Sequence, residues 1–370
     1  MTNSKGLLVS GALLSSLINA TAMADEAPKV LMVLSSYGQM QGDKLVQPGY
    51  EFDEMSKSYL VLDKAGAEIT FASPLGGKLI TDKYDKNKAY NQAFLEDTSA
   101  VAALETSYKL SDINPADYDA VYVVGGKGPM FDLAKDSNLK KIIASVYQNN
   151  GVIGAVCHGP AALLDVKLTN GQYLVDGKRI SAFTNEEESI FTKAWTMPFE
   201  LETRLSEQGA NFVQDGLMLN QVSIDGRIIT GQNPFSTADS AKEMAKQLGL
   251  TLASDLRFKD DETVLLIEKF IVNPAKASQE FKANTSNYEP MLMAMFGLYQ
   301  SQHATTQHQL NSALELMLQT QSLINHPKLD AAIAKAYLAL NNKDTAKAVL
   351  AASIKQHPDS QDLKTLLATL

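Results

Sequence analysis

A cysteine and a histidine stand where an apolar strand-like run turns sharply. Cys157 and His158 follow residues 152–156, and Gly159-Pro160 comes next. This pattern is typical of a nucleophile elbow, a strand-to-helix turn that exposes one side chain at the carboxyl edge of a sheet. Because a thiol at a helix start lies in the positive end of the helix dipole, we expect a lowered pKa for Cys157. The alternative is a buried structural cysteine, since free cysteines are often buried.

Nucleophilic catalysis by a thiol also requires a base or a positive field, an oxyanion pocket and a group that moves substrate protons. Cys157 is the only cysteine, and His158 is the only histidine between residues 25 and 300. Histidine-assisted chemistry in this part of the chain must therefore use His158 or a residue of another chain. The missing second histidine argues against glutamine hydrolysis. Histidine and cysteine do not cluster here, so the sequence predicts no metal site.

The first 24 residues have the pattern of a signal peptide. Lys5 precedes a mostly apolar stretch, residues 6–18, and Ala22-Met23-Ala24 offers a small-x-small cleavage site. We expect the mature protein to begin at Asp25 and to be exported, into the periplasm if the source is Gram-negative. The alternative is a disordered or helical N-terminus. No later segment is long and apolar enough for a membrane span.

The composition restricts the classes of partner. The formal net charge is −9, which argues against nonspecific binding to nucleic acid or anionic membranes, because both call for a basic face. An exported chain with one cysteine is not a disulfide scaffold. With 45% hydrophobic and 20% charged residues the chain is globular, and its length suggests two domains.

Strand-like and helix-like segments alternate over residues 25–250. Such alternation predicts an α/β domain with a doubly wound, mainly parallel sheet, helices on both faces, and ligands at the carboxyl ends of the strands. Residues 76–117 look like a polar insertion with one or two short helices, and Asp225-Gly226 predicts a hairpin turn. We expect strands at 30–34, 67–71, 119–124, 152–156, 179–184, 221–224 and 227–230, and helices at 52–65, 139–148, 199–208 and 237–248.

Residues 251–370 lack strand signals and show helical spacing of Ala, Leu, Gln and Lys, which predicts an all-α domain. The segment 327–358 resembles one tetratricopeptide unit, and a shift of 34 residues finds no clear second copy. A single repeat cannot bury its own face, so these helices must pack on each other, on the first domain or on another chain. A plain helical bundle and a peptide-binding groove both remain open. The unit's matching positions are Ala334, Tyr337, Ala346, Leu350, Ser353 and Pro358.

The segment Val156–Ala161 resembles the signature of the ThiJ/PfpI superfamily, cysteine-bearing relatives of the class I glutamine amidotransferases. Further segments resemble the glyoxalase III and heat-shock chaperone branch over roughly residues 28–248, and the resemblance implies a flavodoxin-like, class I amidotransferase-like sheet. It does not extend to residues 250–370. The segments that carry it are Gly49-x4-Glu54, Ala72–Gly77, Gly125-Gly126-x-Gly128-x2-Phe131-Asp132-Leu133, Phe183-Thr184-Asn185-x-Glu187-Glu188 and Thr230–Pro234.

The resemblance implies a role for each matched residue. Cys157 is the nucleophile, His158 its triad histidine, and Glu188 the acid that orients the histidine, with Glu187 as the alternative. Glu54 is the helix glutamate that, when protonated, hydrogen-bonds the sulfur. Each also has a structural reading: a solvated helix face for Glu54, helix-dipole compensation for Glu188, and a local backbone cap for His158.

The loop beside the nucleophile carries the oxyanion pocket that the resemblance implies. The amides of Gly126 and His158 line it, because glycine lets the main chain approach closely, although Gly125-Gly126 has the simpler reading of a turn. Lys127 departs from the branch, which usually has histidine here. A lysine cation can support a thiolate or an anionic substrate, or it can abolish a substrate contact.

The function implied is that of a cysteine-dependent glyoxalase, a hydro-lyase of the D-lactate dehydratase type. It converts 2-oxoaldehydes such as methylglyoxal to hydroxy acids through a Cys157 hemithioacetal, without glutathione, metal or cofactor. One alternative is a stress-response holdase chaperone or thiol redox sensor, whose helical domain binds protein clients. Another is a thiol amidase or peptidase with an open cleft. The resemblance also implies a homodimer.

Overall fold

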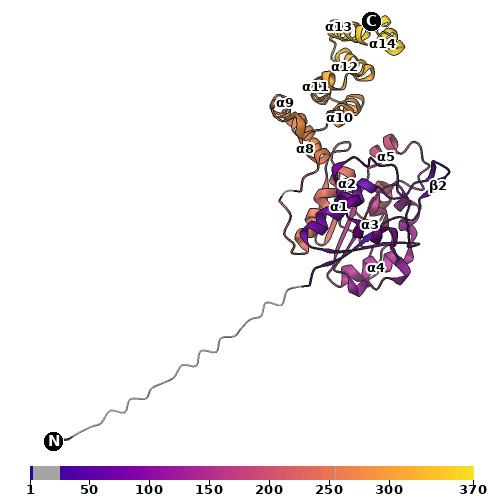
Figure 1. Cartoon of the computed structure of the whole chain (residues 1–370), viewed down its shortest axis with the longest axis vertical. Coiled ribbons are helices and arrows are strands. Elements are labelled where there is room, and N and C mark those ends of the chain that lie inside the picture. Colours follow the sequence, from indigo (N-terminus) through magenta and orange to yellow (C-terminus); the bar gives the residue numbers. More distant parts are fainter. Residues whose placement is uncertain (3–25, 255) are drawn as a thin grey trace.

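The structure is a computed structural model that describes residues 1–2, 26–254 and 256–370. The predicted signal peptide falls almost entirely on residues 3–25, which lie outside the described residues. Figure 1 shows an α/β part built around one sheet and a column of helices that leaves it at α8 and ends at the C-terminus. None of the described helices is long and apolar enough to cross a membrane.

Seven strands form the central sheet, in the order β10-β11-β7-β6-β1-β4-β5. Every neighbouring pair is parallel except β10–β11, the hairpin predicted at Asp225-Gly226. The order β4-β1-β6-β7-β11 is that of a flavodoxin-like doubly wound sheet, so the predicted fold class is confirmed. The strands are β1 (Lys29–Val33), β4 (Glu68–Ser73), β5 (Tyr108–Lys109), β6 (Ala120–Val123), β7 (Val152–Val156), β10 (Val222–Asp225) and β11 (Ile228–Gly231).

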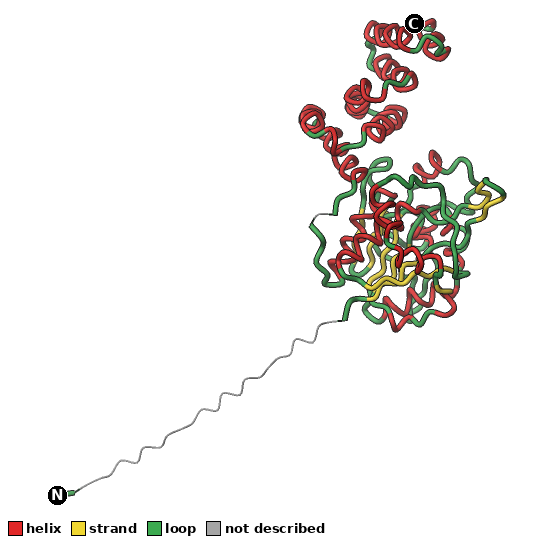
Figure 2. The backbone as a smooth tube through the Cα atoms, viewed as in Figure 1, coloured by secondary structure: helices red, strands yellow, loops and turns green. Residues whose placement is uncertain are grey.

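Helices cover both faces of the sheet, as Figure 2 shows. In β1, Val30 and Met32 join the core under α1 and α7, while Leu31 and Val33 join the core on the opposite face, under α4. Successive side chains of a strand point to opposite faces, so a strand covered on both sides must be apolar throughout. The helices of this part are α1 (Phe52–Ala65), α2 (Ala89–Glu96), α3 (Thr98–Glu105), α4 (Ser137–Gln148), α5 (Asn185–Phe191), α6 (Leu201–Glu207) and α7 (Thr237–Gln247).

The predicted strand at 179–184 was wrong in length, and the predicted insertion at 76–117 contains one strand that was not expected. The expected strand at 179–184 shortens to β8 (Arg179–Ile180), which pairs with β9 (Asn211–Phe212) outside the central sheet. The expected insertion at 76–117 holds its two short helices but also β5, which extends the sheet edge beside β4. A second hairpin, β2 (Gln39–Gln41) with β3 (Lys44–Gln47), lies outside the sheet.

Short 3₁₀ turns complete the loops, and one of them follows the nucleophile. Residues Gly159–Leu163 form the 3₁₀ turn η5, and Leu164 is already extended. The expected helix after Cys157 is therefore a single short turn. The others are η1 (Leu110–Asp112), η2 (Pro115–Asp117), η3 (Gly128–Met130), η4 (Leu133–Lys135), η6 (Pro234–Ser236) and η7 (Thr285–Asn287).

The C-terminal region is helical throughout its described length. The hairpins α10–α11 and α12–α13 stack on one another, and both begin with a proline at the first helical position. Helix α11 has 18 residues and α13 has 14, a difference that hides any repeat from a fixed 34-residue shift. The tetratricopeptide assignment stays a prediction. The helices are α8 (Lys259–Val272), α9 (Pro274–Ala283), α10 (Pro290–His303), α11 (Gln307–Ile324), α12 (Pro327–Ala339), α13 (Lys343–Gln356) and α14 (Gln361–Ala368).

Candidate active site

Cys157 lies at the sharp turn between β7 and η5, at the carboxyl end of the sheet. Its φ is +59°, a left-handed conformation that non-glycine residues adopt at a cost and that nucleophile elbows require. The Cys157 N–H donates to the Gly231 carbonyl and its C=O accepts from the Phe183 N–H, each at 2.9 Å. Both backbone groups are thus fixed, so the surrounding sheet holds the strained turn in place.

A linear chain of three side chains runs from the sulfur. Cys157 Sγ lies 3.3 Å from His158 Nδ1, and His158 Nε2 lies 2.9 Å from Glu188 Oε2. Cys157 is 4% exposed and His158 is 2% exposed, so the chain is shielded from water. Burial raises the pKa of Glu188, but the hydrogen bond and charge of His158 outweigh it and hold that pKa below its ordinary value. An ionised Glu188 orients the His158 imidazole.

The two adjacent glutamates of α5 have separate tasks. Glu187 is the third helical residue, and it forms a capping box with Thr184, the residue before the helix. It also accepts hydrogen bonds from the Met218 N–H and the Gln232 and Asn233 side chains. The structure therefore brings Glu188 to His158, whereas Glu187 is used in the fold.

Glu54 lies on the first turn of α1 and points toward the sulfur. Its Oε2 accepts a hydrogen bond of 2.9 Å from the Gly125 N–H, and the residue is fully buried. Its Oε1 is buried without a full hydrogen bond, but carboxyl and thiol lie close enough for each to change the other's pKa. A buried carboxyl beside the nucleophile can take or give a proton there.

Burial decides the protonation of this pair. It raises the pKa of the Cys157 thiol well above its ordinary value, and the Glu54 charge raises it further, against a weaker effect of the Gly126 amide. Burial likewise raises the pKa of Glu54. Burial therefore disfavours the charged form of both groups, and a charge on Glu54 further disfavours the thiolate. The expected lowering of the Cys157 pKa by a helix dipole was wrong, because only a short 3₁₀ turn follows a deeply buried thiol.

The loop after β6 brings backbone donors to the sulfur. Gly126 has a φ of +88°, and a side chain there would collide with the backbone of Tyr50 and Glu51. Only glycine fits this position. The Gly126 amide lies close enough to the Cys157 sulfur to lower its pKa, so it is placed to hold an oxyanion on a carbon bound to that sulfur. His158, whose amide follows the nucleophile, supplies the donor usual in an elbow.

Lys127 joins the site from the same loop. Its Nζ lies 3.1 Å from Asp82 Oδ2, and its side chain is 20% exposed. Burial opposes its charge, but Asp82 and Glu51 outweigh burial and hold the pKa of Lys127 above its ordinary value. The ammonium in turn lowers the pKa of Glu54 and of Glu188. Lys127 is therefore a cation that favours the ionised forms of neighbouring carboxyls, while burial still holds the pKa of Glu54 well above its ordinary value.

Two residues of this site, Glu51 and Asp82, were not predicted from the sequence. Glu51 precedes α1, and burial with the Asp53 charge raises its pKa to about 7, while its charge raises the pKa of Glu54. Its place within the Gly49-x4-Glu54 segment offered a signal. Asp82, which pairs with Lys127, lies in the polar insertion and had none. Among the described residues, no cluster of His, Cys, Asp and Glu has the arrangement of a metal site.

Comparison with known proteins identifies the family. The model of the DJ-1/PfpI family matches residues 45–247. This chain belongs to that family. It is 32% identical to the "Glutathione-independent glyoxalase hsp3101" of Schizosaccharomyces pombe over 246 residues, which cover 62% of this chain and all of that protein.

Two solved structures resemble the α/β part. The Rapid Encystment Protein 24 kDa of Francisella tularensis is 36% identical, with a TM-score of 0.56 over 60% of this chain and 99% of its own. Glyoxalase III of Candida albicans is 29% identical, with a TM-score of 0.53 over 60% of this chain and 97% of its own. Each is spanned almost completely by part of this chain, and the family match ends before the C-terminal helices.

Proposed function

We propose that this protein is a glutathione-independent glyoxalase that converts a 2-oxoaldehyde to a 2-hydroxy acid. The observation that carries the proposal is the convergence of four groups on the Cys157 sulfur: His158, Glu54, the Gly126 amide and, through His158, Glu188. Relatives that carry the name glyoxalase match the α/β part over their full or nearly full length. The proposal assigns a nucleophile, a base and an oxyanion pocket without cofactor or metal.

The chemistry begins with the Cys157 thiolate, formed when His158 or Glu54 takes the thiol proton. The sulfur attacks the aldehyde carbon, a carbon–sulfur bond forms, and the carbonyl electron pair becomes an oxyanion that the Gly126 and His158 amides hold. Protonation of this oxygen gives the hemithioacetal.

A proton then moves between the two carbons. Glu54 or His158 removes the hydrogen of the first carbon to form an enediolate and returns a proton to the second carbon. The proton of the first hydroxyl passes to the oxygen of the second carbon, which leaves a thioester beside a hydroxyl group. Water cleaves the thioester, releases the hydroxy acid and restores the Cys157 thiol. The net reaction adds one water to the substrate.

The test is turnover of methylglyoxal by residues 25–370 without glutathione, with Cys157→Ala as the control. Lactate formation that depends on Cys157 supports the proposal. Absence of turnover by a folded protein whose thiol still reacts with iodoacetamide would contradict it. Lys127→His, which restores the residue usual in the glyoxalase III branch, then measures whether Lys127 supports or limits the rate.

A client-binding role for the helical region is a second proposal, supported by large apolar side chains that this region exposes. Protection of a heat-denatured client by both the wild type and Cys157→Ala would support it, and loss of protection with Cys157 would contradict it. A peptidase is less well supported, because the 4% exposure of Cys157 leaves little room for an extended chain. The apolar residues are Leu265, Val272, Met291, Met295 and Leu323.

Export stays a proposal that depends on the sequence of residues 1–24. Cell fractionation and N-terminal sequencing test it: a mature N-terminus at Asp25 outside the cytoplasm is expected, and a retained Met1 contradicts it. The homodimer implied by the family is likewise a proposal, which the mass in solution tests.

A further inference from the structure

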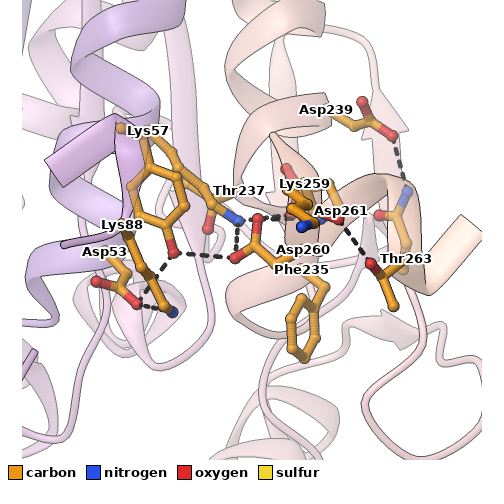
Figure 3. A network of polar contacts seen from close by, with 12 residues as sticks. Asp53, Lys57, Lys88, Phe235, Thr237, Asp239, Lys259, Asp260, Asp261 and Thr263 are labelled. Atoms are coloured by element: carbon orange, nitrogen blue, oxygen red, sulfur yellow. Dashed lines mark hydrogen bonds and ion pairs between the residues drawn. The ribbon is translucent and has the colours of Figure 1, made fainter. Parts of the chain in front are cut away.

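A lysine that the proposed mechanism does not use is buried one helical turn after Glu54. The side chain of Lys57 is 2% exposed, and its Nζ lies 2.8 Å from Asp260 Oδ2 and 2.5 Å from Asp261 Oδ1. Figure 3 shows the two carboxylates reaching Lys57 from another part of the chain. They are on the first turn of α8, the helix that opens the C-terminal region. A buried ion pair of this kind ties the helical region to α1.

The same turn of α1 is held through a second residue. The Tyr90 hydroxyl lies 2.9 Å from Asp260 Oδ2 and 3.1 Å from Asp53 Oδ2, between the two carboxylates. Lys88 Nζ is 2.5 Å from the same Asp53 oxygen. Asp53 immediately precedes Glu54. Asp53, just before Glu54, and Lys57, three residues after it, therefore belong to one polar network that ends on α8.

Residues of this helical turn contact two different parts of the structure, the polar network and the active site. Residues four apart lie on the same helix face, so Asp53 and Lys57 both meet the network. Glu54, which directly follows Asp53, points toward Gly125 and Cys157. Its carboxyl has a single full hydrogen bond, from the Gly125 N–H, and its other oxygen has none. The position of Glu54 against the sulfur therefore follows the position of the helix.

The ion pair between Lys57 and the two aspartates is buried, so water cannot take the place of either partner. Lys57 Nζ is enclosed by aromatic rings, 4.9 Å from the centre of Tyr90 and 5.6 Å from that of Phe258. An ammonium ion in such surroundings is stable only with its counter-charges, and removing them leaves an uncompensated buried charge. Among the described residues, the ion partners of Lys57 are Asp260 and Asp261 on α8, and the α/β part before α8 supplies none.

We propose that Asp260 and Asp261 are positioning residues for Glu54, so that the C-terminal helical region completes the active site instead of acting as a separate module. Both aspartates lie beyond residues 45–247, the part that the family model matches. This inference rests on the proposed function for one point, the role of the Glu54 carboxyl in glyoxalase turnover. Its structural content is that α8, through Lys57, sets the distance between the Glu54 carboxyl and the Cys157 sulfur.

The test uses the full-length mature protein and the double variant Asp260→Asn/Asp261→Asn. Because small displacements of a catalytic group cost large factors in rate, we expect kcat to fall by about 10-fold or more with KM nearly unchanged. Cys157 alkylation by iodoacetamide is measured against pH in parallel. Weaker coupling to the Glu54 charge should move the midpoint of that profile to lower pH. The matched control is Lys269→Met/Glu280→Gln, which removes an ion pair between α8 and α9 at the surface, and both readouts should stay at wild-type values.

A second variant separates positioning from loss of fold. Lys57→Met/Asp260→Asn/Asp261→Asn removes the tie without leaving a buried charge unpaired, and we expect it to fold and to show the same loss of kcat and the same shift in alkylation. Wild-type kcat and an unshifted alkylation profile in either folded variant would overturn the proposal. If the wild type itself shows no methylglyoxal turnover, the proposed function fails, whereas the alkylation profile still decides this inference.

Discussion

Glu54→Gln should separate thiol reactivity from turnover. The substitution keeps an oxygen that accepts from the Gly125 N–H but removes the charge that raises the pKa of Cys157. A like charge within about 4–6 Å shifts a pKa by roughly 1–3 units. Removing it lowers the Cys157 pKa, so more thiolate is present at pH 7. Part of that gain is offset, because nucleophilicity falls with pKa with a Brønsted slope of about 0.4–0.5.

The net result is a rise of about 3- to 60-fold in the rate of alkylation of Cys157 at pH 7. Methylglyoxal turnover should move the opposite way and fall by about 10²- to 10⁴-fold, because a general acid–base group is lost. Stopped alkylation followed by mass spectrometry and a lactate assay give the two rates. Glu96→Gln, on the exposed end of α2, is the matched control. A fall in both rates together would refute the charge assignment, and unchanged turnover would remove Glu54 from the mechanism.

Three further predictions concern the surrounding groups. Glu188→Gln should lower kcat by about 10- to 100-fold and leave the unfolding free energy unchanged. Glu187→Gln should instead lower the unfolding free energy by about 1–3 kcal/mol, because buried hydrogen bonds are lost. A lactate assay and urea unfolding measure the two effects, and the reverse pattern would exchange the roles of the two glutamates. Gly126→Ala should lose both turnover and stability, since its φ of +88° and its close backbone neighbours leave no room for a methyl group, and a fully active variant would contradict that geometry. Burial raises the folded-state pKa of Glu51 to about 7, so the stability it contributes is complete below its unfolded pKa and is lost as pH rises toward 7. Glu51→Gln should therefore be the more stable protein above pH 7, by up to about 3 kcal/mol, and equal urea midpoints at pH 8 would show that Glu51 is solvated.

The sequence carried most of the α/β fold because its signals are local. A strand covered on both faces must be continuously apolar, and β1 after Lys29, β6 and β7 are. The predicted helix at 52–65 has the bounds of α1. Prediction failed where neighbours decide: β8 is two residues long because it pairs with β9 outside the central sheet, and β5 forms because the edge of β4 was open to it.

Cys157 was named from its residue type and its place in the elbow, and Glu54, Glu188 and Gly126 from the family resemblance, but the protonation chemistry of the site was not predicted. The order of an apolar strand, Cys-His and Gly-Pro in the sequence predicts the elbow at Cys157. The direction of its pKa depends on burial and on the charge of Glu54, which comes from a helix far away in the sequence. The choice between Glu187 and Glu188 likewise depended on which carboxyl faces His158 when α5 forms.

The sequence by itself determined the doubly wound sheet, the all-helical C-terminal region and the cysteine at the elbow, because apolar periodicity and turn residues act over short stretches of chain. Only the tertiary structure decided which groups share the sulfur's environment. It also joined Lys57 to Asp260 and Asp261, about two hundred residues apart in sequence. The physical reason is that electrostatics in a dry interior depends on distances through space, and spacing along the chain does not encode those distances.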